Sequence, residues 1–180
     1  MLKADDLPVV DRHRTYGWED PSISAGAAAR MDGLTFLRAM ADGTIPPAPV
    51  AATIGFTVRS VEPGRVVFEL QPAEHLYNPI GLVHGGVLAT LLDSATGCAV
   101  HSTLPQGTSY ASVDLTVKFL RAVRADTPLL TCEGTVIQAG GRTALAEARL
   151  YGEGERLYAH ATSTVMIFRP ESGRGDRPAA

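Results

Sequence analysis

The sequence predicts an α+β domain in which a curved, mainly antiparallel sheet of about six strands wraps one long helix. Residues 78–101 form a stretch long enough for about four or five helical turns, with apolar side chains on one broad arc. A segment with the pattern of a β-hairpin precedes this stretch, and several strand-like segments joined by tight turns follow it. The open edges of such a sheet favour pairing between subunits, so we expect a dimer or a dimer of dimers.

An N-terminal extension, residues 1–47, is expected to precede the domain. Residues 1–30 mix charge, proline and an alanine-rich run without a clear apolar period, which indicates a poorly ordered or loosely docked segment. From residue 31 to about 41 an apolar side chain recurs every third position, and Gly43 follows, so a short amphipathic helix is predicted there. The proline-rich segment 45–49 is predicted to be a linker.

The domain itself is assigned to residues 48–169, and its strands are predicted from alternating apolar and polar side chains. The predicted strands are 54–61, 65–71, 110–123, 129–138, 143–151 and 157–168. Pro63-Gly64 provides the first hairpin turn, and two glycine-containing turns separate the last three strands. The polar tail 170–180 is rich in glycine and proline and is expected to be disordered.

Composition and charge argue against several classes of function. The formal net charge of −3 argues against general nucleic-acid binding, which needs a basic surface. The first residues contain charge and proline before any apolar run, and no stretch reaches membrane-spanning length, so a cytoplasmic protein without a membrane partner is expected. Cys98 and Cys132 lie in apolar segments without Cys-x-x-Cys spacing, which favours buried reduced thiols over a metal site or a disulfide.

The long helix has the features of a reaction site. Asp93 is the only carboxylate in residues 78–101, and its helical neighbours are mostly small or apolar, so no i,i+4 ion pair neutralises it. This charge is therefore either solvated or used in chemistry. The Gly85-Gly86 pair at the start of the helix leaves backbone N–H groups unobstructed at the positive end of the helix dipole, where an anion is attracted.

The spacing of the polar and glycine residues around this helix is fairly specific. The residues are Asn78, His84-Gly85-Gly86, Asp93 and Ser112-Val113-Asp114. Together they resemble the hotdog-fold acyl-CoA thioesterases of the phenylacetate-degradation type, over about residues 50–168. The resemblance implies a hotdog fold and hydrolysis of an acyl-CoA, or of another acyl thioester, to a carboxylic acid and a free thiol. No cofactor and no metal are implied.

The resemblance also implies roles for individual residues. Asp93 is implied as the general base or the nucleophile, and the Gly85 N–H as the group that polarises the thioester carbonyl. Asn78 and His84 are implied to organise that corner of the site, and Ser112 to help hold the attacking water. These roles agree with the chemistry, because a thiolate leaving group has a pKa near that of cysteine, about 8.5, and departs with little help from a general acid.

The separation of the two central groups predicts a shared site. Eight helical positions separate Gly85 from Asp93, which corresponds to about 12 Å at about 1.5 Å per residue. That distance is too long for both groups to act on one carbonyl carbon. We therefore expect Gly85 of one subunit to meet Asp93 of another across a two-fold axis, which makes the dimer the smallest active unit.

Each of these residues also has a purely structural interpretation. Asp93 fits a solvated or core-capping acid, and the Gly85-Gly86 pair fits close packing of the helix on the sheet. His84 fits a helix cap as well as it fits a positioning role, and Asn78 before a proline is a natural turn residue. Four basic residues have two interpretations: they bind the phosphates of coenzyme A as a patch, or they are merely solvated charges at strand ends. These residues are Lys118, Arg121, Arg124 and Arg142.

One competing function remains open, a non-catalytic acyl-CoA-binding module that uses the same pocket without turnover. A serine hydrolase is excluded because the sequence has no Gly-x-Ser-x-Gly motif. A hotdog hydratase needs an aspartate and a histidine together near the helix start, whereas His84 and Asp93 are nine positions apart. No helix-turn-helix or basic segment supports a DNA-binding sensor. The sequence names neither the acyl group nor the thiol carrier, which is coenzyme A or a protein-bound pantetheine.

Overall fold

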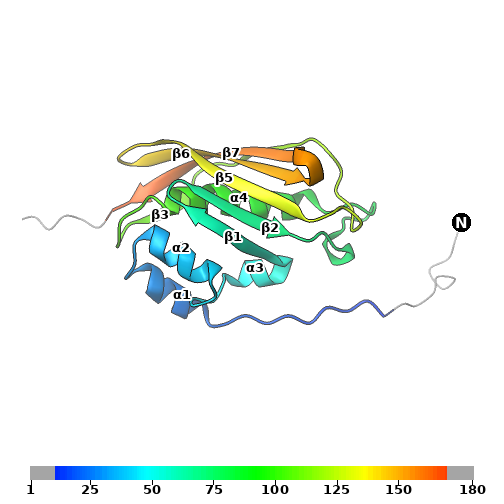
Figure 1. Ribbon diagram of the computed structural model, residues 1–180, viewed down its shortest axis with the longest axis horizontal. Helices are drawn as coiled ribbons and strands as arrows, with labels where there is room; N and C mark the ends of the chain where they lie inside the picture. The colour runs from blue at the N-terminus through cyan, green and yellow to red at the C-terminus, as the bar shows by residue number, and fades with distance from the viewer. Residues whose placement is uncertain (1–10, 170–180) are drawn as a thin grey trace, which may run out of the picture.

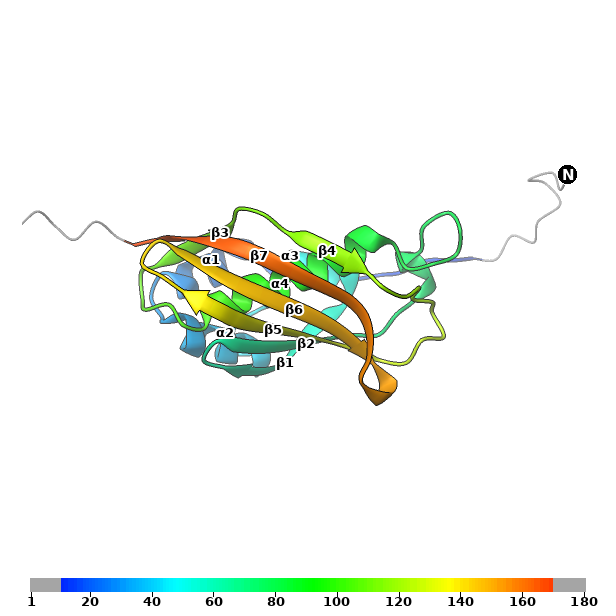
Figure 2. The same cartoon turned by 90° about the horizontal axis from the view of Figure 1, so that it is seen from above.

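One antiparallel sheet of seven strands wraps a long helix, α4 (Gly85–His101), in the computed structural model, which describes residues 11–169. The strands are β1 (Phe56–Glu62), β2 (Arg65–Leu70), β3 (Ser109–Ser112), β4 (Thr116–Phe119), β5 (Leu130–Ala139), β6 (Thr143–Gly152) and β7 (Arg156–Phe168). Their order in the sheet is β1-β2-β5-β6-β7-β3, and β4 also pairs with β7 (Figures 1 and 2). The predicted α+β fold class is confirmed.

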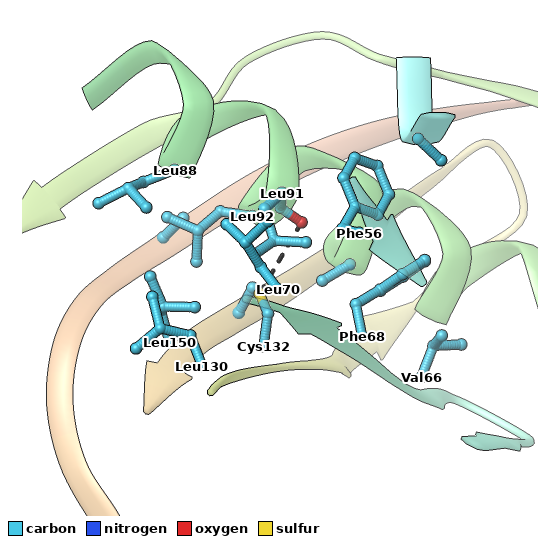
Figure 3. Close-up of a cluster of buried hydrophobic side chains, with 14 of the residues drawn as sticks. Phe56, Val66, Phe68, Leu70, Leu88, Leu91, Leu92, Leu130, Cys132 and Leu150 are labelled. Atoms are coloured by element: carbon cyan, nitrogen blue, oxygen red, sulfur yellow. Dashed lines mark hydrogen bonds between the residues drawn. The ribbon is translucent and has the colours of Figure 1, made fainter. Parts of the chain in front are cut away.

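The main core lies between α4 and the sheet. Leu91, Leu92 and Ala95 of α4 have no exposed surface, and alternate side chains of β2, β5 and β6 point toward them (Figure 3). The helix approaches β5 closely at Gly134, where a Cβ atom would lie 2.1 Å from the carbonyl oxygen of Ala95. Both cysteines are free thiols, as predicted, and the thiol of Cys132 lies 3.8 Å from the carbonyl oxygen of Leu91.

The prediction of one strand over residues 110–123 was wrong, because this segment forms two strands on the same neighbour. β3 and β4 both pair with β7, with Ser112 opposite Val165 and Thr116 opposite Thr162. Between β3 and β4, the regular backbone pairing with β7 is interrupted at Asp114. Instead, the Asp114 carboxylate accepts the Thr164 N–H at 3.0 Å, and the Asp114 carbonyl accepts from the Ser163 hydroxyl at 2.8 Å. This irregularity raises the strand number from about six to seven.

Three helices precede β1: α1 (Pro21–Ala28) and α2 (Gly33–Ala41) lie in the N-terminal extension, and α3 (Pro49–Ile54) lies at the start of the domain. Only α2 was predicted. Residues 21–28 were expected to be loosely docked, but they form α1. Residues 45–49 were expected to be a linker followed by a strand from residue 54, but α3 lies between the prolines and β1. Asp20 is the N-cap of α1, because its carboxylate accepts the Ser22 N–H. The first residue of α3 is a proline, and its C-cap is Gly55, which has a φ of 95°.

The helices of the extension are part of the packed molecule. Leu37 of α2 and Ile45 after it belong to the same core cluster as α4 and the sheet, and Ala27 of α1 is also buried in it. Figure 1 shows α2 and α3 beside β1. The outer parts of the predicted extension and tail, residues 1–10 and 170–180, lie outside the described residues. Among residues 11–169, no helix combines the length and apolarity needed to cross a membrane.

Candidate active site

Asp93 and Ser112 lie together where the middle of α4 faces the end of β3. The Ser112 hydroxyl donates a hydrogen bond to Asp93 Oδ1 at 2.8 Å, although the two residues are 19 positions apart in sequence. The register of β3 against β7 puts Ser112 next to this face of α4. The hydrogen bond orients one carboxylate oxygen of Asp93 and leaves the other to interact with a ligand or water.

The carboxylate of Asp93 opens into a shallow cavity of about 410 Å³. The lining residues are Ala89, Thr90, Asp93, Ser112, Val113, Asp114 and Leu115. Within residues 11–169, no lysine, arginine or histidine forms an ion pair with Asp93. A half-buried carboxylate held by a neutral hydroxyl, without a cation, has the character of a proton acceptor or nucleophile.

The start of α4 presents a free backbone N–H group. His84 caps the helix, because its Nδ1 accepts the Gly86 N–H at 2.8 Å, and its carbonyl accepts from Val87 at 2.9 Å. In the part of the chain that the structure describes, the Gly85 N–H has no hydrogen-bond acceptor. A donor at the positive end of a helix dipole is suited to a developing oxyanion.

Asn78 shapes the loop that leads to this helix. Its Oδ1 accepts the N–H groups of Ile80 and Leu82, both at 3.1 Å, and its own N–H donates to the Leu82 carbonyl at 2.7 Å. This turn lies beside a second cavity, of about 330 Å³. The lining residues are Asn78, Leu82, Val83, Gly85, Leu88, Phe119, Leu120, Arg121, Ala122 and Val123. Phe119 stands over Gly85, where a Cβ atom would lie 3.2 Å from the Phe119 ring.

The five predicted site residues therefore form two groups within one chain. Asp93 and Ser112 line one cavity, and Asn78 and Gly85 line the other, while His84 lines neither and caps the helix. One cavity therefore presents a carboxylate, and the other a backbone N–H without an acceptor among the described residues.

The pattern of the sequence did not single out Tyr110, which lies over the outer face of α4. A Cβ atom at Gly97 would be 2.9 Å from the Tyr110 ring, so this tyrosine needs a glycine below it. Burial raises the pKa of Tyr110 well above its ordinary value, and burial also raises the pKa of the neighbouring Cys98 thiol to about 12. Cys98 is therefore protonated at neutral pH and is a poor nucleophile. No strand or helix period marks such a contact, because it depends on how β3 lies against α4.

The four basic residues considered for a phosphate patch do not form one group. The Arg121 guanidinium donates to the Leu157 carbonyl at one end of β7, beside the Asn78 cavity. The carbonyl of Arg142 accepts from the Ile167 N–H near the other end of β7, ten positions away or about 33 Å along a strand. Arg121 lines the same cavity as Asn78 and Gly85. Among residues 11–169, no cluster of three or more histidine, cysteine, aspartate or glutamate side chains is arranged to hold a metal ion.

Comparisons with known proteins point to one family. A model of the thioesterase superfamily matches residues 80–159. A candidate esterase of Halobacterium salinarum is 31% identical over 118 residues, which cover 63% of this chain and 76% of that protein. The 1,4-dihydroxy-2-naphthoyl-CoA hydrolase of Listeria monocytogenes is 26% identical over 115 residues, which cover 64% of this chain and 92% of that protein. The solved structure of a candidate thioesterase of Ralstonia eutropha, a phenylacetic acid degradation-related protein, is 31% identical with a TM-score of 0.66, and the match covers 72% of this chain and 98% of that one.

Proposed function

Because the chain belongs to the thioesterase superfamily and has the hotdog fold, we propose that it hydrolyses acyl-CoA thioesters through Asp93 and Gly85 of two different subunits. The observation that carries this proposal is the Asp93 carboxylate, which has no cationic partner among the described residues and faces an open cavity. A CoA hydrolase among its relatives supports coenzyme A as the thiol carrier. We assign the activity to residues 48–169.

Asp93 starts the reaction in one of two ways. As a general base it takes a proton from water, and the resulting hydroxide attacks the thioester carbonyl carbon. As a nucleophile it attacks that carbon itself, and water then hydrolyses the acyl-enzyme anhydride. Either way the C–S bond breaks, coenzyme A leaves as a thiolate that takes up a proton, and the acyl group ends as a carboxylic acid. The Ser112 hydroxyl fixes the orientation of Asp93 and helps to hold the water.

The Gly85 N–H stabilises the oxyanion that forms as the carbonyl carbon becomes tetrahedral. Asn78 and His84 position this donor: Asn78 through the turn that it closes before the helix, and His84 by taking up the Gly86 N–H as a cap. With that neighbouring N–H occupied, the Gly85 N–H is the one directed at a ligand.

A second subunit completes the site. The flanks of the two cavities carry large apolar side chains that are more than half exposed: Ile80 (78%), Val113 (60%), Phe119 (53%) and Leu120 (51%). Covering this surface with another copy would bury apolar area and bring the Gly85 cavity of one chain to the Asp93 cavity of the other. Pairing of two such dimers back to back would give the dimer of dimers.

A direct test is thiol release from acyl-CoA by the wild type and by the Asp93→Asn variant. The amide is nearly isosteric with the carboxylate but cannot take the proton, so we expect kcat to fall by about 10²–10⁴ with the fold retained, as judged by circular dichroism. Activity within a few-fold of the wild type would remove Asp93 from the reaction. Saturable binding of acyl-CoA by the wild type without thiol release would instead identify a non-catalytic binding module.

A further inference from the structure

A third cavity, of about 490 Å³, lies outside the two half-sites and is lined partly by the end of the N-terminal extension and partly by the start of the domain that follows it. Its walls come from α2, α3 and the segment between them, and from β1 and β2, and its floor is formed by Ser94 and Cys98 of α4. Apart from this floor, the lining lies between residues 37 and 68, before the part of the chain that matches the family model.

The cavity is suited to a neutral apolar group. Its larger lining side chains are Leu37, Met40, Val50, Phe56, Val58 and Phe68. The space between them exists because α3 presents the small side chains of Ala51 and Ala52. Of the polar groups in the lining, the Ser94 hydroxyl donates to the Thr90 carbonyl at 2.9 Å and the Cys98 thiol is protonated at neutral pH. The one carboxylate among the lining residues is that of Asp42.

The floor of the cavity begins next to the proposed base. Ser94 follows Asp93 directly in α4, and Cys98 lies about one turn further along the same helix. The linings of the Asp93 cavity and of this cavity share no residue, so an acyl chain whose carbonyl carbon lies at Asp93 would have to pass from Asp93 to Ser94, one residue along α4, to reach it. A volume of about 490 Å³ falls within the range of about 300–1,000 Å³ that is typical of small-molecule pockets.

We propose that this cavity holds the acyl chain of the substrate, so that its lining, to which α2 and α3 contribute, selects neutral apolar acyl groups of medium length. The inference rests on the proposed thioesterase function and adds the substrate class to it. The carboxylate of Asp42 at the cavity, whose oxygen accepts the Thr44 N–H at 2.9 Å, acts against a second negative charge on the acyl group.

The inference predicts a dependence on acyl-chain length. Each buried methylene should raise kcat/KM about fourfold until the cavity is filled, and longer chains should bring no further gain. A series of acetyl-, butyryl-, hexanoyl-, octanoyl- and decanoyl-CoA measures this increase. Succinyl-CoA, which has the same carbon number as butyryl-CoA but a terminal carboxylate, should be at least tenfold poorer than butyryl-CoA.

Two substitutions on α3 separate filling of the cavity from a general effect on the helix. Ala52→Phe places a large side chain in the cavity, whereas Thr53→Phe places the same side chain at the next position, which is exposed and does not line the cavity. We expect Ala52→Phe to lower kcat/KM for octanoyl-CoA at least tenfold and to leave acetyl-CoA within twofold. Thr53→Phe should leave both unchanged. If Ala52→Phe fails to fold, Met40→Ala serves instead, and it should move the plateau to longer chains.

Binding of S-alkyl-CoA thioethers, measured by calorimetry with butyl, hexyl and octyl probes, distinguishes the two proposals. If no acyl-CoA is hydrolysed but Ala52→Phe abolishes the gain in affinity with chain length, the thioesterase proposal fails and the acyl cavity stands. If acyl-CoAs are hydrolysed but the length dependence is the same in the wild type, Ala52→Phe and Met40→Ala, the thioesterase proposal stands and the cavity assignment is overturned.

Discussion

His101 is a buried titratable side chain that the proposed chemistry does not use. It lies at the end of α4 with its ring 5.4 Å from Phe36 and 5.1 Å from Tyr110. Burial lowers the pKa of His101, and the charge of Asp32 offsets this effect only in part. The folded protein therefore favours the neutral imidazole.

This burial predicts a pH dependence of stability. In the unfolded chain a histidine takes up a proton as the pH falls through about 6.5, whereas folded His101 resists protonation until the pH reaches its lowered pKa. The stabilisation is complete above about pH 6.5 and is lost as the pH falls toward the folded pKa. In urea unfolding we expect the free energy of unfolding of the wild type to decrease from pH 7 to pH 5.5, and that of His101→Phe to decrease less. Parallel decreases in the two proteins would contradict the assignment.

At the level of single residues, the sequence predicted the absence of a charge partner for Asp93 better than it predicted the contacts of the candidate residues. The lack of a helical counter-charge for Asp93 was readable from the sequence. Its hydrogen bond to Ser112 was not, because the serine was expected to hold water and the contact depends on where β3 lies against α4. His84 had two open interpretations, and the structure shows the capping hydrogen bond to Gly86.

At the level of elements, the start of α4 offers a clean test of the oxyanion donor. Gly85 is the first residue of the helix, where proline is favoured because that N–H has no intrahelical partner. Gly85→Pro therefore removes the N–H with little cost to the helix, and Gly85→Ala is the matched control, since it adds the same Cβ contact with Phe119 but keeps the N–H. We expect Gly85→Ala to retain activity within about fivefold.

For Gly85→Pro we expect kcat to fall by about 10²–10³, as when one oxyanion donor is lost. Steady-state thiol release from one acyl-CoA measures both variants, and their melting temperatures report on the helix. Equal losses in the two variants would indicate that crowding of Phe119, rather than the N–H, is responsible.

Helices and strands with a regular pattern of apolar side chains were predictable from the sequence. Those that depend on capping residues or on contacts with neighbouring elements were not. α4 and the strands β2, β5, β6 and β7 begin and end within about two residues of the predicted positions. α1 is alanine-rich and is specified by the Asp20 cap, and the six-residue α3 lies between a proline and Gly55. The division between β3 and β4 depends on hydrogen bonds from Asp114 to β7, which no local pattern encodes.

At the scale of the whole molecule, the proposed function requires more than one chain. The carboxylate and the backbone donor lie in separate cavities, and exposed Val113 and Phe119 flank them. The alternation of strands and the helix period predicted the fold, whereas under the proposed function a second copy placed against this surface brings the two groups together. The segments of α1 and α3, which were expected to be a loosely docked segment and a linker, instead contribute Ala27 and Ala51 to the core.

The most direct test of the account mixes two inactive chains, one with Asp93→Asn and one with Gly85→Pro. Each homodimer should be nearly inactive. Each heterodimer holds one doubly altered site and one intact site, so an equal, randomly exchanged mixture should recover about a quarter of wild-type activity if the sites are independent. Native mass spectrometry must show that mixed dimers form. Recovery of about a quarter is the result we predict, and mixed dimers that stay as inactive as their parents would contradict a site shared between subunits.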